Sequence, residues 1–408
     1  MKAGRILFLI IVLLSVQLAK AQLNCVTAEY SRLQFSKNAQ QAQNIQKAEQ
    51  FIRQAIASPT TDRIENGIIK IPVVIHNLYH KPDQKVTDEQ VAAQLDLLNK
   101  AFRRQNADTV KIPDVFKPVA ADCEIEFHLA TSDPMRRSTT GIIRKYTPVT
   151  NWTMDDKVKS SAEMGDDPWD SRLYLNIWVC QMERFAGYST VPGSDAKLDG
   201  IVLGLAAFGA GQRTIVHEAG HWMGLKHIWG DAYCGDDGVD DTPKQASYTV
   251  GCPGTVRVTC GNSPTGDMYN NYMDFTNDAC RFLFTRGQKA RMQAVFLNGG
   301  SRNSLMNSAG LDKPLIFESP LPDEDPRWLQ VKLYPNPVSN TLYLDFSYDV
   351  RWIGKTIFIT NLVGQSIKNV TISSKIQAID VTNFKPGIYF LAAKNDQGLS
   401  MKMKFIKL

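Results

Sequence analysis

Apolar and polar residues in the middle of the chain follow strand and helix periods, which predicts a mixed α and β domain. Residues 68–79 form an apolar, β-branched run typical of a buried strand, and later segments alternate as half-buried strands do. Thr87 begins a capping-box pattern, which predicts a helix to about residue 104, and a second helical pattern covers residues 285–298. The predicted strands are residues 68–79, 124–129, 173–180, 187–192 and 200–203, with 187–192 as the candidate edge strand.

Two regions of different pattern flank this domain. Residues 23–66 are polar, and residues 30–56 carry the thin apolar face of one or two exposed helices. Residues 329–408 contain short β-branched and aromatic runs separated by turn residues, which predicts a small β-sandwich. The predicted class is therefore α+β with a C-terminal β-sandwich, and the proline-rich stretch 314–326 lies between the two parts.

The first 21 residues read as a secretory signal peptide. Lys2 and Arg5 precede an apolar stretch at residues 6–16, and Ala19-Lys20-Ala21 is a small-residue cleavage site. No later apolar run is long enough to cross a bilayer. Removal of this segment lowers the formal charge from +5 to +2, which gives no reason to expect nucleic acid or an anionic membrane as partner.

The chemistry is concentrated in the pattern H-E-x-x-H-x-x-G-x-x-H, which begins at His217. Positions four apart share one face of a helix, so His217 and His221 can offer two imidazoles to one metal ion. Gly224 permits a left-handed turn that ends the helix and lets His227 supply a third nitrogen. Three protein ligands leave an open position, as catalytic zinc requires, and Glu218 is placed as general base toward water at the metal.

Two other interpretations of this pattern remain open. Three ordinary helix histidines could share it, although the chain has only six histidines in 408 residues. The alternative function is a surface adhesin or peptide-binding module with an inactive or structural zinc site. Glu218 argues against that alternative, because structural zinc has no use for a carboxylate beside its ligands.

A methionine-containing segment, Asn270–Phe275, follows the histidines, and at this point the chain resembles the metzincin metalloproteases. Met273 matches the methionine that packs beneath the zinc ligands in that family. Within the metzincins the chain is similar to the pappalysins, which implies two subdomains flanking a cleft and a zinc endopeptidase activity. The residues that carry the resemblance are 217–230, 238–243, 271–274, 278–280 and 284–288.

The resemblance also has implications for specificity. An Asp matching Asp278 lies at the base of the pocket for the residue after the cut in pappalysins, which implies cleavage on the amino side of Arg and less often Lys. The alternative is a solvated surface carboxylate. Pappalysins usually have Tyr two residues after the methionine, whereas this chain has Phe275, so the group that contacts the oxyanion differs here.

An acidic loop, residues 236–242, supplies hard oxygen atoms in a turn-rich segment. This chemistry suits calcium, and the pappalysin resemblance implies it as well, although the spacing of an EF-hand is missing. The candidate ligands are Asp237, Asp240, Asp241 and Thr242.

Seven cysteines in an exported chain make disulfides plausible, and the odd count leaves one sulfur without an internal partner. Spacing allows three pairings of the four cysteines after the histidines, and the resemblance implies Cys234–Cys260 and Cys252–Cys280. Cys123 and Cys180 lie on predicted strands, as free thiols or as a third bridge.

Cys25 is the remaining cysteine and lies near the start of the polar N-terminal segment. Its thiolate could occupy the open position of the zinc and keep the enzyme latent, a role that pappalysin prosegments also assign to a cysteine. The alternative is an incidental thiol. The segment would then be a prosegment, with self-processing before Arg53 or Arg63 if the enzyme prefers Arg.

The C-terminal region resembles the sorting domains of type IX secretion cargo. The residues that carry this resemblance are 334–337, 361–364, 386–389 and 402–408. It implies type IX secretion machinery as a partner, protein or peptide substrates, and a secreted or cell-surface location. The expected organisation is signal peptide 1–21, prosegment 22–66, catalytic domain 67–312, linker 313–328 and sorting domain 329–408.

Overall fold

The structure is a computed structural model that describes residues 25–57, 67–317, 331–347, 349–394 and 400–408. The predicted signal peptide and residues 318–328 of the predicted linker lie outside the described residues. The helices are α1 (Thr27–Lys37), α2 (Ala39–Ala57), α3 (Asp88–Phe102), α4 (Thr214–Trp222) and α5 (Arg286–Ala294). None of the helices in these ranges is long and apolar enough to span a bilayer.

A six-stranded sheet organises residues 67–317. Its order is β2-β1-β4-β6-β5, and β3 pairs with the second half of β1 beyond the end of β2. All pairs are parallel except β5 with β6, so β5 is an antiparallel edge strand, as predicted. The strands are β1 (Ile69–Tyr79), β2 (Ile125–Leu129), β3 (Ile142–Tyr146), β4 (Leu175–Cys180), β5 (Gly187–Ser189) and β6 (Ile201–Gly204).

Strand β3 is missing from the predicted set. Its sequence places two isoleucines side by side and then two basic residues, Arg144 and Lys145, so no period of two is visible. The strand forms because the second half of β1 offers an unpaired parallel edge there. Tertiary pairing therefore outweighs the weak local pattern.

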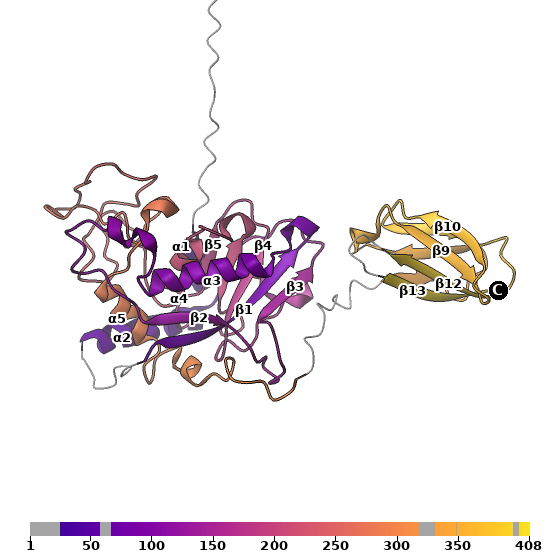
Figure 1. The fold of residues 1–408 in the computed structure, drawn as a ribbon, viewed down its shortest axis with the longest axis horizontal. Coiled ribbons are helices and arrows are strands. Elements are labelled where there is room, and N and C mark those ends of the chain that lie inside the picture. The colour runs from indigo at the N-terminus through magenta and orange to yellow at the C-terminus, as the bar shows by residue number, and fades with distance from the viewer. Residues whose placement is uncertain (1–24, 58–66, 318–330, 348, 395–399) are drawn as a thin grey trace, which may run out of the picture.

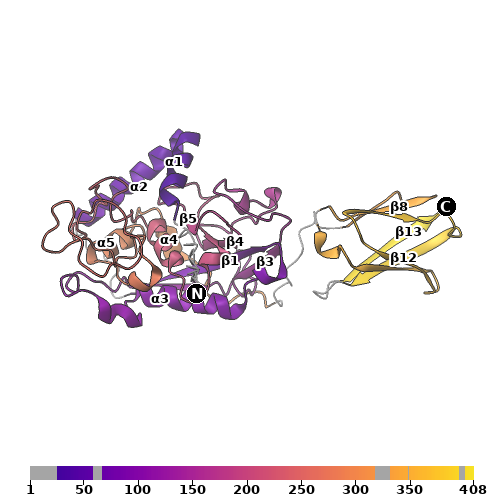
Figure 2. The ribbon, with the colours of Figure 1, turned by 90° about the horizontal axis from the view of Figure 1, so that it is seen from above.

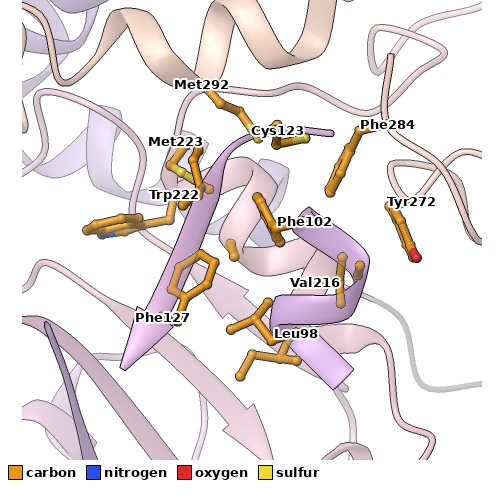
Figure 3. Close-up of a cluster of buried hydrophobic side chains, with 14 of the residues drawn as sticks. Leu98, Phe102, Cys123, Phe127, Val216, Trp222, Met223, Tyr272, Phe284 and Met292 are labelled. Carbon is orange, nitrogen blue, oxygen red and sulfur yellow. The ribbon is translucent and has the colours of Figure 1, made fainter. Parts of the chain in front are cut away.

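The main core lies between the sheet and helices α3 to α5. Thr87 caps α3 and its side chain accepts the Gln90 N–H, which confirms the predicted capping box. At the end of that helix, Phe102 packs against Phe127 of β2 and Phe284, with ring centroids 5.1 and 4.9 Å apart (Figure 3). Helix α4 packs against β5, β6 and α3, and these neighbours fix the position of the histidines it carries.

Helices α1 and α2 follow the predicted pattern, but they are not simply exposed. Both lie along one side of the catalytic part, with α1 next to β5 and α2 next to α5 (Figures 1 and 2). Tyr30 is 1% exposed, and Ile52 belongs to the main core at 2% exposed. A thin apolar face of few residues is therefore sufficient to bind these helices tightly.

The C-terminal part forms two antiparallel sheets around its own core, which confirms the predicted β-sandwich. One sheet has the order β10-β9-β12-β13 and the other β11-β8-β7. Side chains of β9 and β12 alternate between this core and solvent. The strands are β7 (Lys332–Tyr334), β8 (Thr341–Asp345), β9 (Thr356–Asn361), β10 (Ser366–Thr371), β11 (Ile376–Asp380), β12 (Gly387–Lys394) and β13 (Ser400–Lys407).

Candidate metal centre

Helix α4 is short and fully buried, and it carries the first two histidines on one face. The helix ends at Trp222, and Gly224 adopts a φ of 91°, the left-handed turn that the sequence predicts. A Cβ at Gly224 would lie 3.1 Å from Ile52 and 3.3 Å from Pro192, so the turn also leaves little room. The chain then reverses and brings His227 to the same place.

Nδ1 of each of the three histidines has an oxygen atom as its hydrogen-bond partner. Nδ1 of His217 lies 2.7 Å from the Tyr272 carbonyl, and Nδ1 of His221 lies 2.8 Å from the Leu225 carbonyl. A carbonyl oxygen only accepts, so in both rings Nδ1 carries the proton. Nδ1 of His227 lies 2.5 Å from Oδ1 of Asp231, and a carboxylate fixes the tautomer in the same way.

The three Nε2 atoms therefore face one another without protons. Nε2 of His221 lies 3.1 Å from Nε2 of both His217 and His227. Burial lowers the pKa of His217 well below its ordinary value and that of His221 to about 3, so these rings are neutral. Lone pairs this close repel unless a cation lies between them. Tetrahedral zinc with bonds of ~2.0–2.1 Å places its ligand nitrogens about 3.3 Å apart, so the histidines fit that ion.

Glu218 is fully buried beside the histidines, and burial raises the pKa of its carboxyl. Its Oε2 accepts a hydrogen bond of 2.7 Å from the Thr27 hydroxyl. Its Oε1 is buried and has no hydrogen-bond partner among the described residues. The arrangement leaves one carboxylate oxygen available for a water or substrate proton.

Cys25 completes the cluster. Its Sγ and one nitrogen of each histidine lie within 4.8 Å of one another, and no other group of three or more such ligands occurs in the described part of the chain. The backbone pairs with the edge strand, where Val26 N–H donates to the Gly187 carbonyl at 3.1 Å. Burial and the neighbouring Glu218 raise the pKa of the Cys25 thiol well above its usual range. The thiolate therefore forms here only with a cation beside it.

Met273 lies beneath α4, where the sequence expects it. A Cβ at Gly220 would lie 2.6 Å from Sδ of Met273, so the glycine is what permits this packing. Asn271 holds the turn by donating to and accepting from the Gln288 side chain, at 2.8 and 3.0 Å. Phe275 follows, with its ring centroid 4.8 Å from that of His227.

Asp278 lies in a short 3₁₀ turn, Asp278–Cys280, near the start of α4. Its Oδ2 accepts the Arg213 N–H at 3.1 Å, and its Oδ1 forms an ion pair with Arg281. The Arg213 guanidinium in turn pairs with Asp108 at 2.6 Å. The Asp278 side chain is 26% exposed, so it is neither buried alone nor fully solvated.

The acidic loop does not gather its four candidate ligands into one cluster. Thr242 donates to Asp237 at 2.9 Å, and burial raises the pKa of Asp237 to about 7. Asp241 instead accepts the Gly287 N–H at 2.9 Å, and its buried Oδ1 has no partner within the described part of the chain, while Asp240 is exposed.

The disulfides follow the pairing that the resemblance implies. Cys234 bonds to Cys260 and Cys252 to Cys280, and both bridges staple the irregular segment that follows the histidines. Cys123 and Cys180 are buried free thiols, so the third bridge does not form.

Sequence reasoning missed three contacts of the site. Thr27 donates to Glu218 and accepts the Ser189 N–H at 2.9 Å, and nothing in the sequence distinguishes this threonine from others. The hydrogen bond from His217 to the Tyr272 carbonyl could not be predicted from the sequence either, because every residue has a backbone carbonyl. Asp231 could have been found, since a carboxylate four residues after His227 is a common partner for a metal-binding imidazole.

Two family matches divide the chain along the same lines as the structure. Residues 158–297 match the peptidase family described as Pregnancy-associated plasma protein-A, and residues 332–408 match the Secretion system C-terminal sorting domain. An extracellular metalloprotease of Pyricularia oryzae is 41% identical over 122 residues, which cover 27% of this chain and 43% of the relative. An extracellular metalloprotease of Verticillium alfalfae is 30% identical over 230 residues, which cover 52% of this chain and 69% of the relative. The matches span 43%, 35% and 50% of the first three curated relatives.

Solved structures agree with this grouping. Mature mirolysin of Tannerella forsythia in complex with a cleaved peptide aligns with a TM-score of 0.58 and 39% identity, over 59% of this chain and 96% of that chain. A promirolysin mutant of the same organism aligns with a TM-score of 0.64 and 35% identity. This alignment covers 70% of this chain and 97% of that chain.

The sheet, the three converging imidazoles and the methionine turn define a zinc metalloprotease of the metzincin type. The C-terminal sandwich marks the chain for secretion or the cell surface. Within the metzincins, the chain belongs to the pappalysin family.

Proposed function

We propose that the chain is the latent precursor of a secreted zinc-dependent endopeptidase. The observation that carries this proposal is the convergence of three unprotonated Nε2 atoms beside Glu218, under a cover formed by Cys25. His217, His221 and His227 would hold the zinc. Zinc bound there would polarise the scissile carbonyl and acidify a coordinated water.

The residues of the chain supply the remaining steps. Glu218 takes the proton of the attacking water on its carboxylate and then delivers it to the leaving amine. Strand β5 has a free edge once Cys25 and Val26 depart, and an extended substrate would pair along Gly187–Ser189 by main-chain hydrogen bonds. Phe275 has no hydroxyl, so no side chain of that position donates to the developing oxyanion.

Latency follows from two contacts of residues 22–66. Cys25 Sγ would occupy the open zinc position, and the Thr27 hydroxyl holds Glu218. Promirolysin covers 70% of this chain and mature mirolysin 59%, and this difference of 11% of 408 residues is about the length of residues 22–66. That difference supports a removable prosegment, with the catalytic domain at 67–312.

The expected cleavage position is the amino side of Arg, and less often of Lys, with Asp278 as the pairing carboxylate. Asp278 already holds Arg281, so a substrate guanidinium has to share or displace that partner. In the Asp278→Asn variant, the preference for Arg over uncharged residues should fall about tenfold or more, because a hydrogen bond to a charged partner contributes ~1.5–3 kcal/mol. Cleavage of a peptide library by the mature enzyme, read by sequencing the new amino termini, measures this preference.

Asp278→Asn keeps the acceptor for the Arg213 N–H, so it tests charge rather than shape. Asp195→Asn, at an exposed carboxylate of the same domain, is the matched control and should leave the preference unchanged. An unchanged Arg preference in Asp278→Asn would remove Asp278 from the account of specificity.

Calcium is proposed for the acidic loop, with Asp237, Asp240, Asp241 and Thr242 as candidate ligands, which would have to come together around the ion because the structure does not gather all four into one cluster. The buried Asp237 carboxylate and the unpartnered Asp241 Oδ1 support a cation near this loop. Excess calcium should raise the unfolding temperature by several degrees, since an ion at a hundred times its Kd stabilises by ~2.7 kcal/mol.

The measurement is thermal unfolding after removal of calcium with a calcium-selective chelator, followed by addition of calcium or zinc. Calcium, and not zinc, should restore the original midpoint, and Asp237→Asn should lose the response. A midpoint that ignores calcium in the unchanged protein would refute the calcium site.

Export is proposed to use the signal peptide at residues 1–21 and then the type IX secretion machinery, which would read residues 329–408 across the linker 313–328. The match to the sorting-domain family supports this route.

Metal content and digestion of casein test the whole proposal. The purified mature protein should contain one zinc per chain and lose its hydrolysis of casein with a zinc chelator. Tightly bound zinc without any hydrolysis would favour the alternative of an adhesin or peptide-binding module with a structural site.

A further inference from the structure

Tyr30 of α1 fills a site in the catalytic part that is formed by an aromatic ring, a carboxylate and an ammonium group. Its ring packs on Tyr188 of the edge strand, with centroids 4.6 Å apart. Its hydroxyl donates to Oδ1 of Asp156 at 2.8 Å and accepts from Nζ of Lys159 at 3.2 Å. The same helix adds the Gln34 amide, which donates to Oδ2 of Asp156 at 2.6 Å. These contacts lie on the opposite face of β5 from Glu218, since Tyr188 alternates with Gly187 and Ser189.

Lys159 is the unusual member of this site, because it is only 3% exposed. Its Nζ donates to the Leu198 carbonyl at 2.8 Å, pairs with Asp156 at 2.9 Å and lies 5.1 Å from the Tyr188 ring centroid and 5.6 Å from that of Trp178. Asp156 holds a φ of 66°, a strained conformation for a residue with a side chain. Burying a charge pair and holding a strained backbone both cost free energy, and packing alone requires neither. These two features therefore point to a site that recognises a ligand.

All of these groups except Tyr30 and Gln34 belong to the proposed mature domain. Loss of residues 22–66 would leave a site with an aromatic wall, one carboxylate and one ammonium group. A phenol is the side chain that satisfies all three, because it stacks, donates and accepts. Phenylalanine lacks the hydroxyl, tryptophan only donates, and a cationic side chain would face Lys159.

We propose that this site, lined by Asp156, Lys159, Trp178 and Tyr188, becomes after maturation an exosite for a tyrosine side chain of a protein substrate. The inference rests on the proposed function, since it requires a mature protease that binds polypeptide. Its place beside the edge strand lets a bound tyrosine hold a segment of substrate that lies away from the scissile bond. A peptide shorter than the segment from Cys25 to Tyr30, which connects the two sites in the precursor, would not reach both sites.

The test uses a peptide of residues 28–36 with Arg32→Gln, which contains Tyr30 and lacks Cys25 and Thr27, so it cannot block the metal or Glu218. Without Arg32 and Lys37 it also offers no basic side chain to Asp278. Binding to the processed Glu218→Ala protein is measured by calorimetry, which needs no catalysis. The Tyr30→Phe peptide should bind about tenfold more weakly. Equal affinity of the two peptides, or no binding of either, would overturn the proposal.

Lys159→Met is the matched variant, because it removes the ammonium group while keeping an unbranched apolar chain. In the Lys159→Met protein, the difference in affinity between the Tyr30 peptide and the Tyr30→Phe peptide should become smaller. Only the hydrogen bond to Asp156 should then distinguish the two peptides. An undiminished difference would exclude Lys159 from recognition of the phenol and overturn the site as described. Circular dichroism of the variant checks that it folds.

A competition experiment separates this site from the catalytic centre. With the active mature enzyme, the peptide of residues 28–36 with Arg32→Gln should slow hydrolysis of casein but leave hydrolysis of a short Arg peptide without tyrosine unchanged. Equal inhibition of both substrates would place the peptide in the catalytic centre and refute an exosite. If neither substrate is hydrolysed even without the peptide, the proposed protease function fails, whereas the calorimetric result still decides the tyrosine site.

Discussion

Glu218→Ala should abolish peptide-bond hydrolysis in the mature protein while zinc stays bound. The carboxylate lies beside the three imidazoles without being one of the converging ligand atoms, and its Oε1 has no partner among the described residues. Loss of a general base costs a factor of ~10²–10⁴ in rate. Casein digestion and metal analysis of the same preparation measure the two properties separately.

Glu163→Ala is the control, because this carboxylate is exposed in the same domain. It should retain both activity and metal. A Glu218→Ala protein that hydrolyses casein at the normal rate would exclude Glu218 as the base. A variant that loses zinc together with activity would show that the carboxylate supports the site rather than the reaction.

Cys25→Ala should activate the unprocessed chain. Cys25 lies among the three histidines and pairs through its backbone neighbour with the edge strand, so its side chain closes the site directly. We expect hydrolysis of a short Arg peptide by the full-length precursor to rise at least about tenfold, which corresponds to ~1.4 kcal/mol of lost prosegment binding. The initial rate, measured before any processed chain is visible on a gel, gives this value.

Thr27→Val separates the two contacts of the prosegment, because it removes the hydrogen bond to Glu218 and keeps the side-chain shape. It should activate less than Cys25→Ala, and the double variant should be the most active precursor. Cys123→Ala, at a buried thiol away from the histidines, is the control and should stay latent. If the Cys25→Ala precursor hydrolyses the peptide no faster than the unchanged precursor, the Cys25 thiol does not keep the enzyme latent.

Much of the catalytic part was visible in local patterns. The strand at Ile69–Tyr79, the capped helix that Thr87 begins and the left-handed turn at Gly224 all lie where the patterns place them. These features depend on neighbours within a few residues, so a sequence displays them directly. The disulfide pairing came from the family resemblance, because spacing alone left three choices.

The N-terminal segment that contains α1 and α2 shows where such reasoning ends. Its residues are polar enough to suggest exposed helices, yet Tyr30 and Ile52 are only 1% and 2% exposed. Thr27 reaches Glu218 across 191 positions, and Asp278 accepts the Arg213 N–H across 65 positions. Each of these contacts depends on which surfaces the fold brings together.

By itself the sequence predicted the metal ligands and the general base, and it determined the turn that ends their helix, because helical spacing and glycine geometry act over a single turn of backbone. Only the tertiary structure decided that the three Nε2 atoms face one another without protons, because the oxygen that holds the Nδ1 proton of His217 belongs to Tyr272, 55 positions away. It also decided that Cys25 lies in the same cluster, since no spacing rule connects a thiol to imidazoles nearly half the chain away.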